Sequence, residues 1–537
     1  MLHDFLVIGS GCTGAQAAQT LIESGGRVAL LDVGEKDEHY APLVPKEDFL
    51  RVRRTDPEQH RYFLGDRFEG VPMGSAKGGA QLTPPRQFVT RNAAMLAPFR
   101  DTEFKPVQSL ARGGLGAAWG LGSHVFSDSE LANCGLDRGG MFEAYETVSR
   151  RVGVSGARDD IAPFSLGGLQ SLHEPLAIDE NARFLLSAYE KRRRRLNESG
   201  FYLGRCPLAL LGQDQGSREK SALRDMEFWS DHGRSAYRPW ITLEELQRKP
   251  GFEYLPGRFA LRFHETPDHI EVTVRRTDTG EREIVRCRRL LLATGALATA
   301  RIVMRSFDYR RTRLPMVCNP FSYLASLNLR MLGRAGSELR HSLAQLVLFY
   351  APEPAAPDHV MISIFSYRSL LLFRLAKDFP INYADGKEFL RFLQSALVLA
   401  TINHADFPSD EKFVELVRNS EDPAGDALEG HYRPSAAEKD LIERKNRRIQ
   451  RAFLKLGCVP AKRIDLDPGA SIHYGGTLPF STAEKEFHTA PDGRLYGTSR
   501  VFIADGSAFR YLPAKGPTLT FMAHAHRVAR HALGLGN

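Results

Sequence analysis

The clearest pattern of hydrophobic positions lies in the first forty residues. An uninterrupted apolar run, residues 5–8, precedes a short glycine-rich stretch and then apolar residues at helical spacing (Ala15, Ala18, Leu21 and Ile22). A second apolar run, residues 28–31, ends at Asp32. Short apolar runs indicate buried strands, and apolar residues three or four positions apart indicate one face of a helix. The order therefore predicts a strand–helix–strand unit.

The glycines between the first strand and the helix suggest what this unit binds. Gly9, Gly11 and Gly14 form the pattern G-x-G-x-x-G. The first glycine permits a tight turn, the second lets the backbone approach a pyrophosphate, and the third lets helix and strand pack closely. Asp32 follows Gly9 by 23 residues, where a carboxylate can accept hydrogen bonds from ribose hydroxyls. We interpret the unit as a dinucleotide site rather than a purely structural turn; the motif alone does not choose between NAD and FAD.

Alternating patterns further along predict more strands, at residues 259–263, 270–275 and 290–293. The last of these ends in the glycine turn 294–296 and is followed by a helical pattern. Strands that end in a glycine turn at the ligand edge are typical of a nucleotide-binding sheet. We therefore expect residues 290–293 to be a later strand of the same sheet.

The middle of the chain predicts a second region with its own strands, at residues 345–349 and 360–365, and a long helix from Ser435. Two markedly apolar stretches, residues 369–376 and 392–402, are short enough to be core helices, which we favour over a membrane-docking or lipid-lining surface.

Residues 43–105 show little periodicity and predict a long irregular excursion, and the glycine-dense loop 112–120 follows it. Long loops in compact proteins are usually functional, although a flexible connection is the alternative for this loop.

Composition places the chain among ordinary soluble globular proteins and excludes disordered, collagen-like and coiled-coil classes, with 42% hydrophobic and 25% charged residues. Its 537 residues are enough for two or more compact units. The net charge of +8 is weak evidence for an anionic partner. The basic run Lys191–Arg195 is interpreted as a solvated helix face, and no nucleic-acid partner is expected.

The six cysteines form no CxxC pair, which fits a reducing compartment, and no metal site is expected. The chain starts almost at once with a strand-like run, and no apolar stretch approaches 18 residues, so neither a signal sequence nor a transmembrane segment is expected. We predict a cytoplasmic protein.

The C-terminal seventy residues carry the remaining candidate chemistry. The segment His473–Thr477 reads H-x-G-G-T, and the predicted strand 501–504 ends at Asp505 and Gly506. The segment 512–520, which reads LPAKGPTLT, precedes a closing helix. A histidine is well suited to act as a general base because its pKa lies near working pH, whereas the alternative is a core histidine in a glycine turn.

Together these blocks resemble the glucose-methanol-choline (GMC) oxidoreductase family. They comprise residues 9–32, 113–120, 290–301, 473–477 and 501–520, in family order across nearly the whole length, while the middle region matches weakly. Within the family, the loop 113–120 is most similar to bacterial members and pyranose oxidases.

The resemblance implies an α/β fold with a discontinuous Rossmann-like FAD-binding domain and an α+β substrate domain that contains an antiparallel sheet. The expected FAD-binding domain comprises residues 1–165, 250–315 and 469–537, and the expected substrate-binding cap comprises residues 166–249 and 316–468. Pyranose oxidases that bind flavin covalently have a histidine just before the loop tryptophan, where this chain has Ala118, so we expect non-covalent FAD.

Carried over position by position, the resemblance assigns His473 as the catalytic base that receives the hydroxyl proton while FAD takes the hydride. Gly9, Gly11 and Gly14 would contact the pyrophosphate, Asp32 the adenosine ribose, Phe259 and Gly295 the adenine side, Asp505 and Gly506 the ribityl and phosphate region, and Pro517 and Thr518 the edge of the flavin ring. The remaining expected cofactor-binding residues are Cys12, Thr13, Gly113, Gly114 and Gly116.

One position departs from the family pattern. Gly516 stands where the family usually has Asn or His, opposite the catalytic histidine, and glycine can neither orient an alcohol nor share its proton. Lys515 is a candidate substitute, although a lysine before a turn is more often solvent-exposed, and His524 and His526 of the closing helix are two more.

The leading hypothesis is therefore oxidation of a CH–OH group in a sugar, polyol or natural-product intermediate. A dehydrogenase that passes electrons to a quinone is favoured over an oxidase that uses oxygen. Non-oxidative chemistry, such as that of a lyase or decarboxylase, is the alternative that Gly516 keeps open, and a binding or scaffold protein with a dead site is the third. The oligomeric state is left open.

Overall fold

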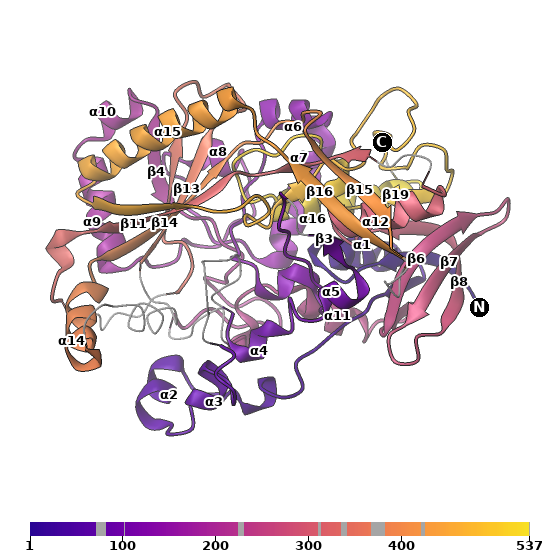
Figure 1. Cartoon of the computed structure of the whole chain (residues 1–537), viewed down its shortest axis with the longest axis horizontal. Helices are drawn as coiled ribbons and strands as arrows, with labels where there is room; N and C mark the ends of the chain where they lie inside the picture. The colour runs from indigo at the N-terminus through magenta and orange to yellow at the C-terminus, as the bar shows by residue number, and fades with distance from the viewer. Residues whose placement is uncertain are drawn as a thin grey trace.

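The computed structural model of the chain describes residues 1–70, 82–100, 103–223, 230–309, 313–334, 341–366, 382–419 and 425–535. Two large sheets dominate these residues and lie at opposite ends of the molecule (Figure 1). Among the described residues, no helix is both long and apolar enough to cross a bilayer.

The first sheet is built around the predicted strand–helix–strand unit. Its strands run in the order β5 (Phe252–Leu255), β2 (Val28–Leu31), β1 (Leu2–Ile8), β8 (Arg282–Leu292), β7 (Ile270–Arg276) and β6 (Arg258–Glu265). β1, β2, β5 and β8 are parallel, whereas β6, β7 and β8 form an antiparallel meander. β19 (Val501–Ile503) pairs in parallel with the end of β8, which brings the C-terminal segment into this sheet. The predicted later strand 290–293 is therefore part of the same sheet.

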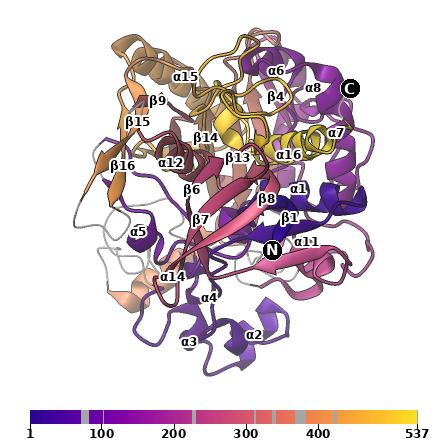
Figure 2. The same cartoon turned by 90° about the vertical axis from the view of Figure 1, so that its right-hand side faces the viewer.

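Helices cover this sheet because their apolar stripes match its buried strands. α1 (Cys12–Glu23) packs against α11 (Pro239–Leu246) and α16 (Thr518–Ala532), and α16 also packs against α7 (Arg138–Val152). α12 (Ala296–Ser306) packs on β6. Figure 2, which looks at this end of the molecule, shows α12 and α16 beside the strands.

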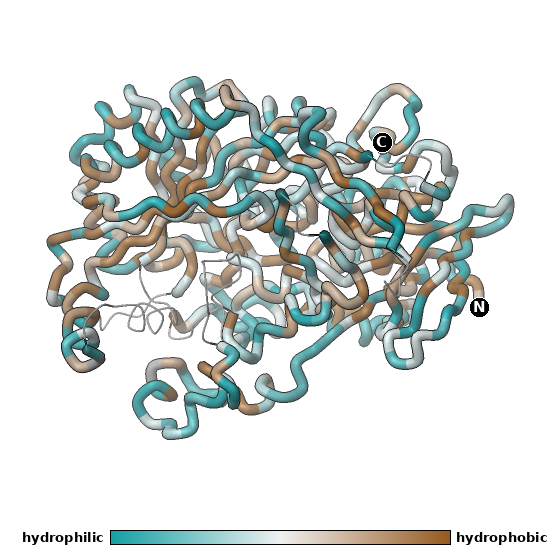
Figure 3. Tube along the Cα trace, in the orientation of Figure 1, coloured by the Kyte–Doolittle hydropathy of each residue, from teal (hydrophilic) through white to brown (hydrophobic). Residues whose placement is uncertain are grey.

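The second sheet is antiparallel throughout, as expected for the α+β part of the fold. Its order is β17 (Val459–Asp465), β11 (Phe321–Leu327), β14 (Leu397–His404), β13 (Val360–Ser366), β12 (Leu346–Tyr350) and β4 (Phe201–Arg205). One face packs against α9 (Glu180–Glu190) and α15 (Ala436–Lys455), which share its apolar core. α15 begins with a capping box formed by Ser435 and Glu438. Figure 3 shows hydrophobic segments along these strands and hydrophilic ones on the outer side of α15.

Smaller elements complete the fold. A third sheet has the order β3 (Phe99–Arg100), β16 (Asp426–Tyr432), β15 (Lys412–Arg418) and β9 (Arg313–Pro315), and β10 (Val317–Cys318) pairs with β18 (Tyr474–Gly475). The described part of the predicted excursion contains only short elements. The short helices are α2 (Phe49–Thr55), α3 (His60–Phe63), α4 (Pro84–Gln87), α5 (Ala93–Leu96), α6 (Asp128–Cys134), α8 (Ala162–Ser165) and α10 (Arg193–Asn197), and α14 (Tyr383–Gln394) is longer.

The expectation of a core helix over residues 392–402 is wrong. α14 ends at Gln394, and β14 begins at Leu397 as a central strand of the second sheet. Phe392 is half-exposed on the helix, whereas Val398, Ala400 and Ile402 are buried. A short apolar run cannot be assigned to helix or strand by periodicity alone, and here the pairing with β11 and β13 decides. The other apolar stretch, 369–376, lies outside the described residues. The basic run is exposed, as expected, and Arg193 within it pairs with Asp160.

A buried ion pair ties α12 to the third sheet. Arg305 donates to both carboxylate oxygens of Asp426, with Nε–Oδ2 and Nη2–Oδ1 distances of 2.7 and 2.6 Å, and the hydroxyl of Tyr309 donates to Oδ2 at 2.6 Å. The Asp426 side chain is fully buried, and that of Arg305 is 6% exposed. Removing one partner would leave a buried charge without compensation.

Asp426→Ala is therefore expected to lower the free energy of unfolding by about 3–5 kcal/mol. Glu388→Ala, which removes an exposed pair with Arg391 on α14, is the matched control and should cost no more than about 0.5 kcal/mol. The midpoints of thermal unfolding compare the two variants. Equal midpoints would show that the buried pair does not stabilise the fold.

Candidate functional site

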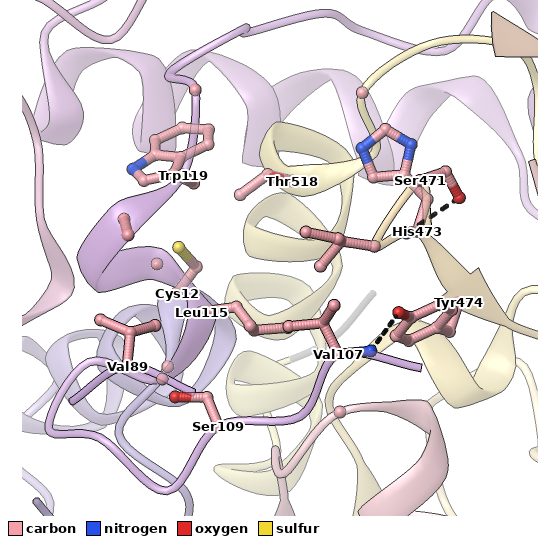
Figure 4. A pocket seen from close by; sticks show the side chains of 18 of the residues that line it. Cys12, Val89, Val107, Ser109, Leu115, Trp119, Ser471, His473, Tyr474 and Thr518 are labelled. Carbon is pink, nitrogen blue, oxygen red and sulfur yellow. Dashed lines mark hydrogen bonds between the residues drawn. The ribbon is translucent and has the colours of Figure 1, made fainter. Parts of the chain in front are cut away.

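A cavity of about 1160 Å³ lies between the two large sheets. One part is formed where β1, β2, β8 and β19 end, the edge at which α/β sheets bind ligands. The other part is walled by side chains of β11, β13 and β14 from the antiparallel sheet. Figure 4 shows Cys12, Leu115, Trp119, Thr518 and His473 around this space. The volume is at or above the upper end of ordinary ligand pockets, about 300–1,000 Å³, and leaves room for more than a small substrate.

The first turn of α1 opens into the cavity. Gly11 is its N-cap residue, and no side chain caps the helix among the described residues. Gly11, Cys12 and Thr13 line the cavity, so the backbone N–H groups of this turn are available to an anion. A Cβ on Gly11 would have only the carbonyl oxygen of Gly113 nearby, at 4.0 Å, so the backbone can be approached closely. These features fit the pyrophosphate of a dinucleotide.

Ser10, in the first glycine loop, contacts both the second glycine loop and Asp32, the residue expected to bind the ribose. Its hydroxyl donates to Asp32 and accepts the backbone N–H of Gly113 at 2.8 Å. Tyr254 also donates to Asp32, at 3.1 Å. Burial raises the pKa of Asp32 to about 7, and the hydrogen bonds from Ser10 and Tyr254 oppose this rise. Asp32 thus stands at the cavity wall with a carboxyl group held in one orientation.

Asp505, at the end of β19, organises the neighbouring turn. It accepts hydrogen bonds from the backbone N–H of Gly295 at 2.8 Å and from the Thr299 hydroxyl at 2.6 Å. Ser507 donates to its other oxygen through both backbone and side chain. Asp505 is buried, and desolvation raises its pKa. This carboxyl fixes where the C-terminal segment meets α12.

Most of the sequence-predicted residues line this one cavity: Gly9, Gly11, Cys12, Thr13, Asp32, Gly114, Gly116, Phe259, Gly295, His473, Asp505, Gly506, Pro517 and Thr518. Gly14 and Gly113 do not. Gly14 instead packs against the β1 end, where an added Cβ would lie 1.8 Å from the carbonyl oxygen of Gly9. Its absent side chain allows the helix to approach the strand, which was one of the two roles expected for it.

The orientation of His473 is set by Asn319. β10 and β18 are antiparallel with Cys318 opposite Tyr474, so the next residues, Asn319 and His473, are also neighbours. The Asn319 amide nitrogen donates to the carbonyl oxygens of His404, Leu512 and Pro513, at 2.8, 3.4 and 2.9 Å. Its Oδ1 lies 3.1 Å from His473 Nδ1.

This arrangement determines the protonation state of the His473 ring. A carbonyl oxygen can only accept, so Nδ1 of His473 carries the hydrogen and Nε2 keeps a free lone pair. Burial lowers the pKa of His473 to about 4, so the ring is neutral at pH 7. The preceding residue, Ile472, has φ +63°, a conformation that is costly for a β-branched side chain and that indicates a constrained turn.

The residues near Gly516 differ from expectation. Lys515 is buried rather than solvent-exposed, and its ammonium pairs with Glu130 at 2.5 Å and donates to the carbonyl oxygen of Val125 at 3.1 Å. His524 contacts the carbonyl oxygen of Ile503, and His526 contacts the Thr20 hydroxyl. Neither histidine lines the cavity.

Sequence reasoning missed His124, which lines the cavity, and Asn319, which contacts His473. His124 follows the glycine-dense loop, is buried and lines the cavity, with Nδ1 3.0 Å from the Ser165 hydroxyl. Asn319 has no local motif, and only the β10–β18 pairing brings it to His473. For His124 the one available signal was its position four residues after Gly120.

Comparison with known proteins finds a family match and relatives that are named as oxidases. Residues 435–525 match the C-terminal model of the family described as GMC oxidoreductase. The chain is 24% identical to 6'''-hydroxyparomomycin C oxidase of Streptomyces lividus, over 98% of this chain and 90% of that protein. It is 23% identical to paromamine 6'-oxidase of Streptomyces fradiae, over 99% and 91%.

Among solved structures, the crystal structure of pyridoxine 4-oxidase from Mesorbium loti covers 99% of both chains with a TM-score of 0.56 and 13% identity, which shows a common fold. The expected fold class and family resemblance are confirmed.

The Asn319 contact predicts an observable tautomer. In protein labelled with ¹⁵N-histidine, the His473 ring should be neutral at pH 7 with its hydrogen on Nδ1, and Asn319→Ala should shift it towards the Nε2-protonated form. His473→Gln identifies the resonances by their loss. An Nε2-protonated ring in the unaltered protein would contradict the assignment.

Proposed function

We propose that this chain, whose C-terminal segment matches the GMC oxidoreductase family, oxidises a CH–OH group of a sugar-like alcohol with FAD as cofactor and His473 as general base. One observation carries the proposal. His473, held by Asn319 with Nε2 free, shares a cavity with the uncapped start of α1. The similar proteins are named as oxidases of paromamine and of a hydroxyparomomycin, which supports a sugar-like substrate.

The residues present fit FAD. The α1 amides and Gly11 would hold the pyrophosphate, Asp32 the ribose, and Pro517 and Thr518 the flavin edge. Bound FAD supplies the hydride acceptor for oxidation of an alcohol. With Ala118 before Trp119, no histidine stands at that place to form a covalent link, so we propose non-covalent binding.

The proton of the substrate hydroxyl passes to Nε2 of His473. The neutral ring can accept it because Asn319 holds the other hydrogen on Nδ1, and it can then donate from both nitrogens. A positioned base of this kind contributes roughly 10²–10⁴-fold to the rate. Asn319 is a positioning residue, since its contact is with His473.

Gly516 favours a second candidate, non-oxidative chemistry at the same cofactor, because no polar side chain follows Lys515. The preference for a dehydrogenase over an oxidase gains no support from the relatives, which are named oxidases. Oxygen consumption compared with reduction of a soluble quinone, measured with the same alcohol, decides between the two acceptors.

The purified protein is expected to carry FAD that acid denaturation releases into the supernatant. At pH 8, above the Asp32 pKa of about 7, Asp32→Ala should weaken FAD binding roughly 10- to 100-fold, because a hydrogen bond to a charged group contributes about 1.5–3 kcal/mol. Fluorescence titration of the apoprotein measures the affinity. Glu253→Ala, on the exposed side of the adjacent strand, is the control. Flavin that stays in the acid precipitate would indicate a covalent link.

Anaerobic mixing with an alcohol panel of paromamine, glucose and mannitol should bleach the flavin absorbance for at least one of them. His473→Ala should slow this reduction by about 10²–10⁴-fold while the protein stays yellow. A yellow protein that no alcohol reduces would instead favour the non-oxidative candidate, and turnover that survives His473→Ala would exclude His473 as the base.

The pH profile follows from the same base. His473 must be unprotonated to act. Because its pKa is about 4, the ring stays unprotonated near neutral pH, and the rate of flavin reduction should fall only as the pH drops through about 4. The flavin absorbance recorded at each pH checks that the cofactor is retained.

A further inference from the structure

A second histidine lies in the same cavity as His473 and has an unused nitrogen. His124 is 1% exposed, and its Nδ1 lies 3.0 Å from the Ser165 hydroxyl. Within the described part of the chain, its Nε2 has no hydrogen-bond partner. Because His124 lines the cavity, this ring nitrogen is available to a ligand there.

His124 also lies beside the place where the chain lacks a polar side chain. A Cβ added to Gly516 would lie 4.0 Å from Cδ2 of His124 and 3.6 Å from the carbonyl oxygen of Gly122. A side chain at position 516 would thus extend towards the His124 ring. Gly122 contributes too, because a Cβ there would lie 3.6 Å from Nε2 of His124. Two glycines therefore leave the ring uncrowded.

We propose that His124 is the second catalytic residue, and that its Nε2–H donates a hydrogen bond to the oxygen of the substrate hydroxyl from which His473 takes the proton. The proposal rests on the function proposed above. The donor then comes from the loop after the glycine-dense segment, because Gly516 gives the C-terminal segment no side chain that could donate.

The two rings have complementary hydrogen-bonding states. His473 presents a lone pair, since Asn319 holds its hydrogen on Nδ1. The alcohol oxygen, which becomes more negative as its proton leaves, needs a donor. The Ser165 hydroxyl can donate to Nδ1 of His124, which leaves the His124 hydrogen on Nε2 and directed to the cavity.

The surroundings favour a neutral donor at His124. Burial lowers the pKa of His124 to about 3, and the positive charges of Lys515 and of a protonated His473 lower it further. A neutral imidazole with its hydrogen on Nε2 can donate without carrying a buried charge. Phe349 lies edge-on to the ring, with centroids 6.4 Å apart.

The test uses the FAD-loaded protein and the alcohol of the panel that reduces it fastest. His124→Phe keeps an aromatic ring but removes the donor, and the limiting rate of anaerobic flavin reduction should fall about 10²–10³-fold. His124→Gln retains an N–H donor and should stay within about tenfold of the unaltered protein. His526→Gln, which alters a buried histidine outside the cavity, should leave the rate unchanged. Equal rates for Phe and Gln at position 124 would overturn the proposal.

A double variant asks whether the donor can be moved. Gly516 has no positive φ, so its backbone accepts a side chain. His124→Ala leaves space beside position 516. Adding Gly516→Asn to this variant should raise its rate of flavin reduction at least tenfold. A double variant no faster than His124→Ala, at equal flavin content, would count against a donor at this position.

The ring itself gives a readout that needs no turnover. In ¹⁵N-histidine spectra, His124 should be neutral between about pH 5 and 8 with its hydrogen on Nε2, the opposite tautomer to His473, and Ser165→Ala should abolish this preference. A hydrogen on Nδ1 would overturn the proposal. A different outcome is that the tautomers are as expected although no alcohol of the panel reduces the flavin of the unaltered protein. That result would contradict the proposed function and leave the assignment of the His124 donor standing.

Discussion

The architecture of the site depends on how closely the start of α1 approaches the ends of β1 and β8. Gly9 has φ +98°, and a Cβ there would lie 2.6 Å from the carbonyl oxygen of Ala293. A Cβ on Gly14 would lie still closer, 1.8 Å from the Gly9 oxygen. With no side chains between them, the helix start and the ends of both strands converge on one edge. The free amides of α1, the Asp32 carboxyl and the turn held by Asp505 consequently face a common space.

The opposite wall of that space is made differently. There the antiparallel sheet contributes side chains from β11, β13 and β14, and the short β10–β18 pair presents Asn319 and His473 together. The first wall relies on backbone groups and the second on side chains. Binding of a phosphate-containing group and proton transfer can thus be served by separate parts of the fold.

The sequence predicted the features that depend on neighbouring residues. The strand–helix–strand unit, the strands of the first sheet other than β5 and the helix after Ser435 follow from periodicity and glycine spacing, and the structure contains them. Most expected cavity residues were identified because they belong to compact motifs. Residues 392–402 were assigned wrongly, because an apolar run of that length suits a helix as well as a strand and only its sheet partners decide.

Features that need distant segments could not be predicted. Asn319 becomes a partner of His473 only through strand pairing, and Lys515 is buried only because Glu130 on α6 meets it. His124 lies in an unremarkable stretch, and its cavity position depends on Ser165 and the two glycines around it. None of these neighbours is marked by local spacing.

The buried contact between Lys515 and Glu130 has a consequence for how this site can diversify. Lys515 also donates to the carbonyl oxygen of Val125, so the residue before Gly516 is anchored to the residue after His124. Positions 124 and 516 are therefore linked through one buried lysine. Homologous sequences that regain a polar residue at 516 should also have lost the histidine at 124, and this exchange could reshape the alcohol end of the cavity while the cofactor end stays unaltered.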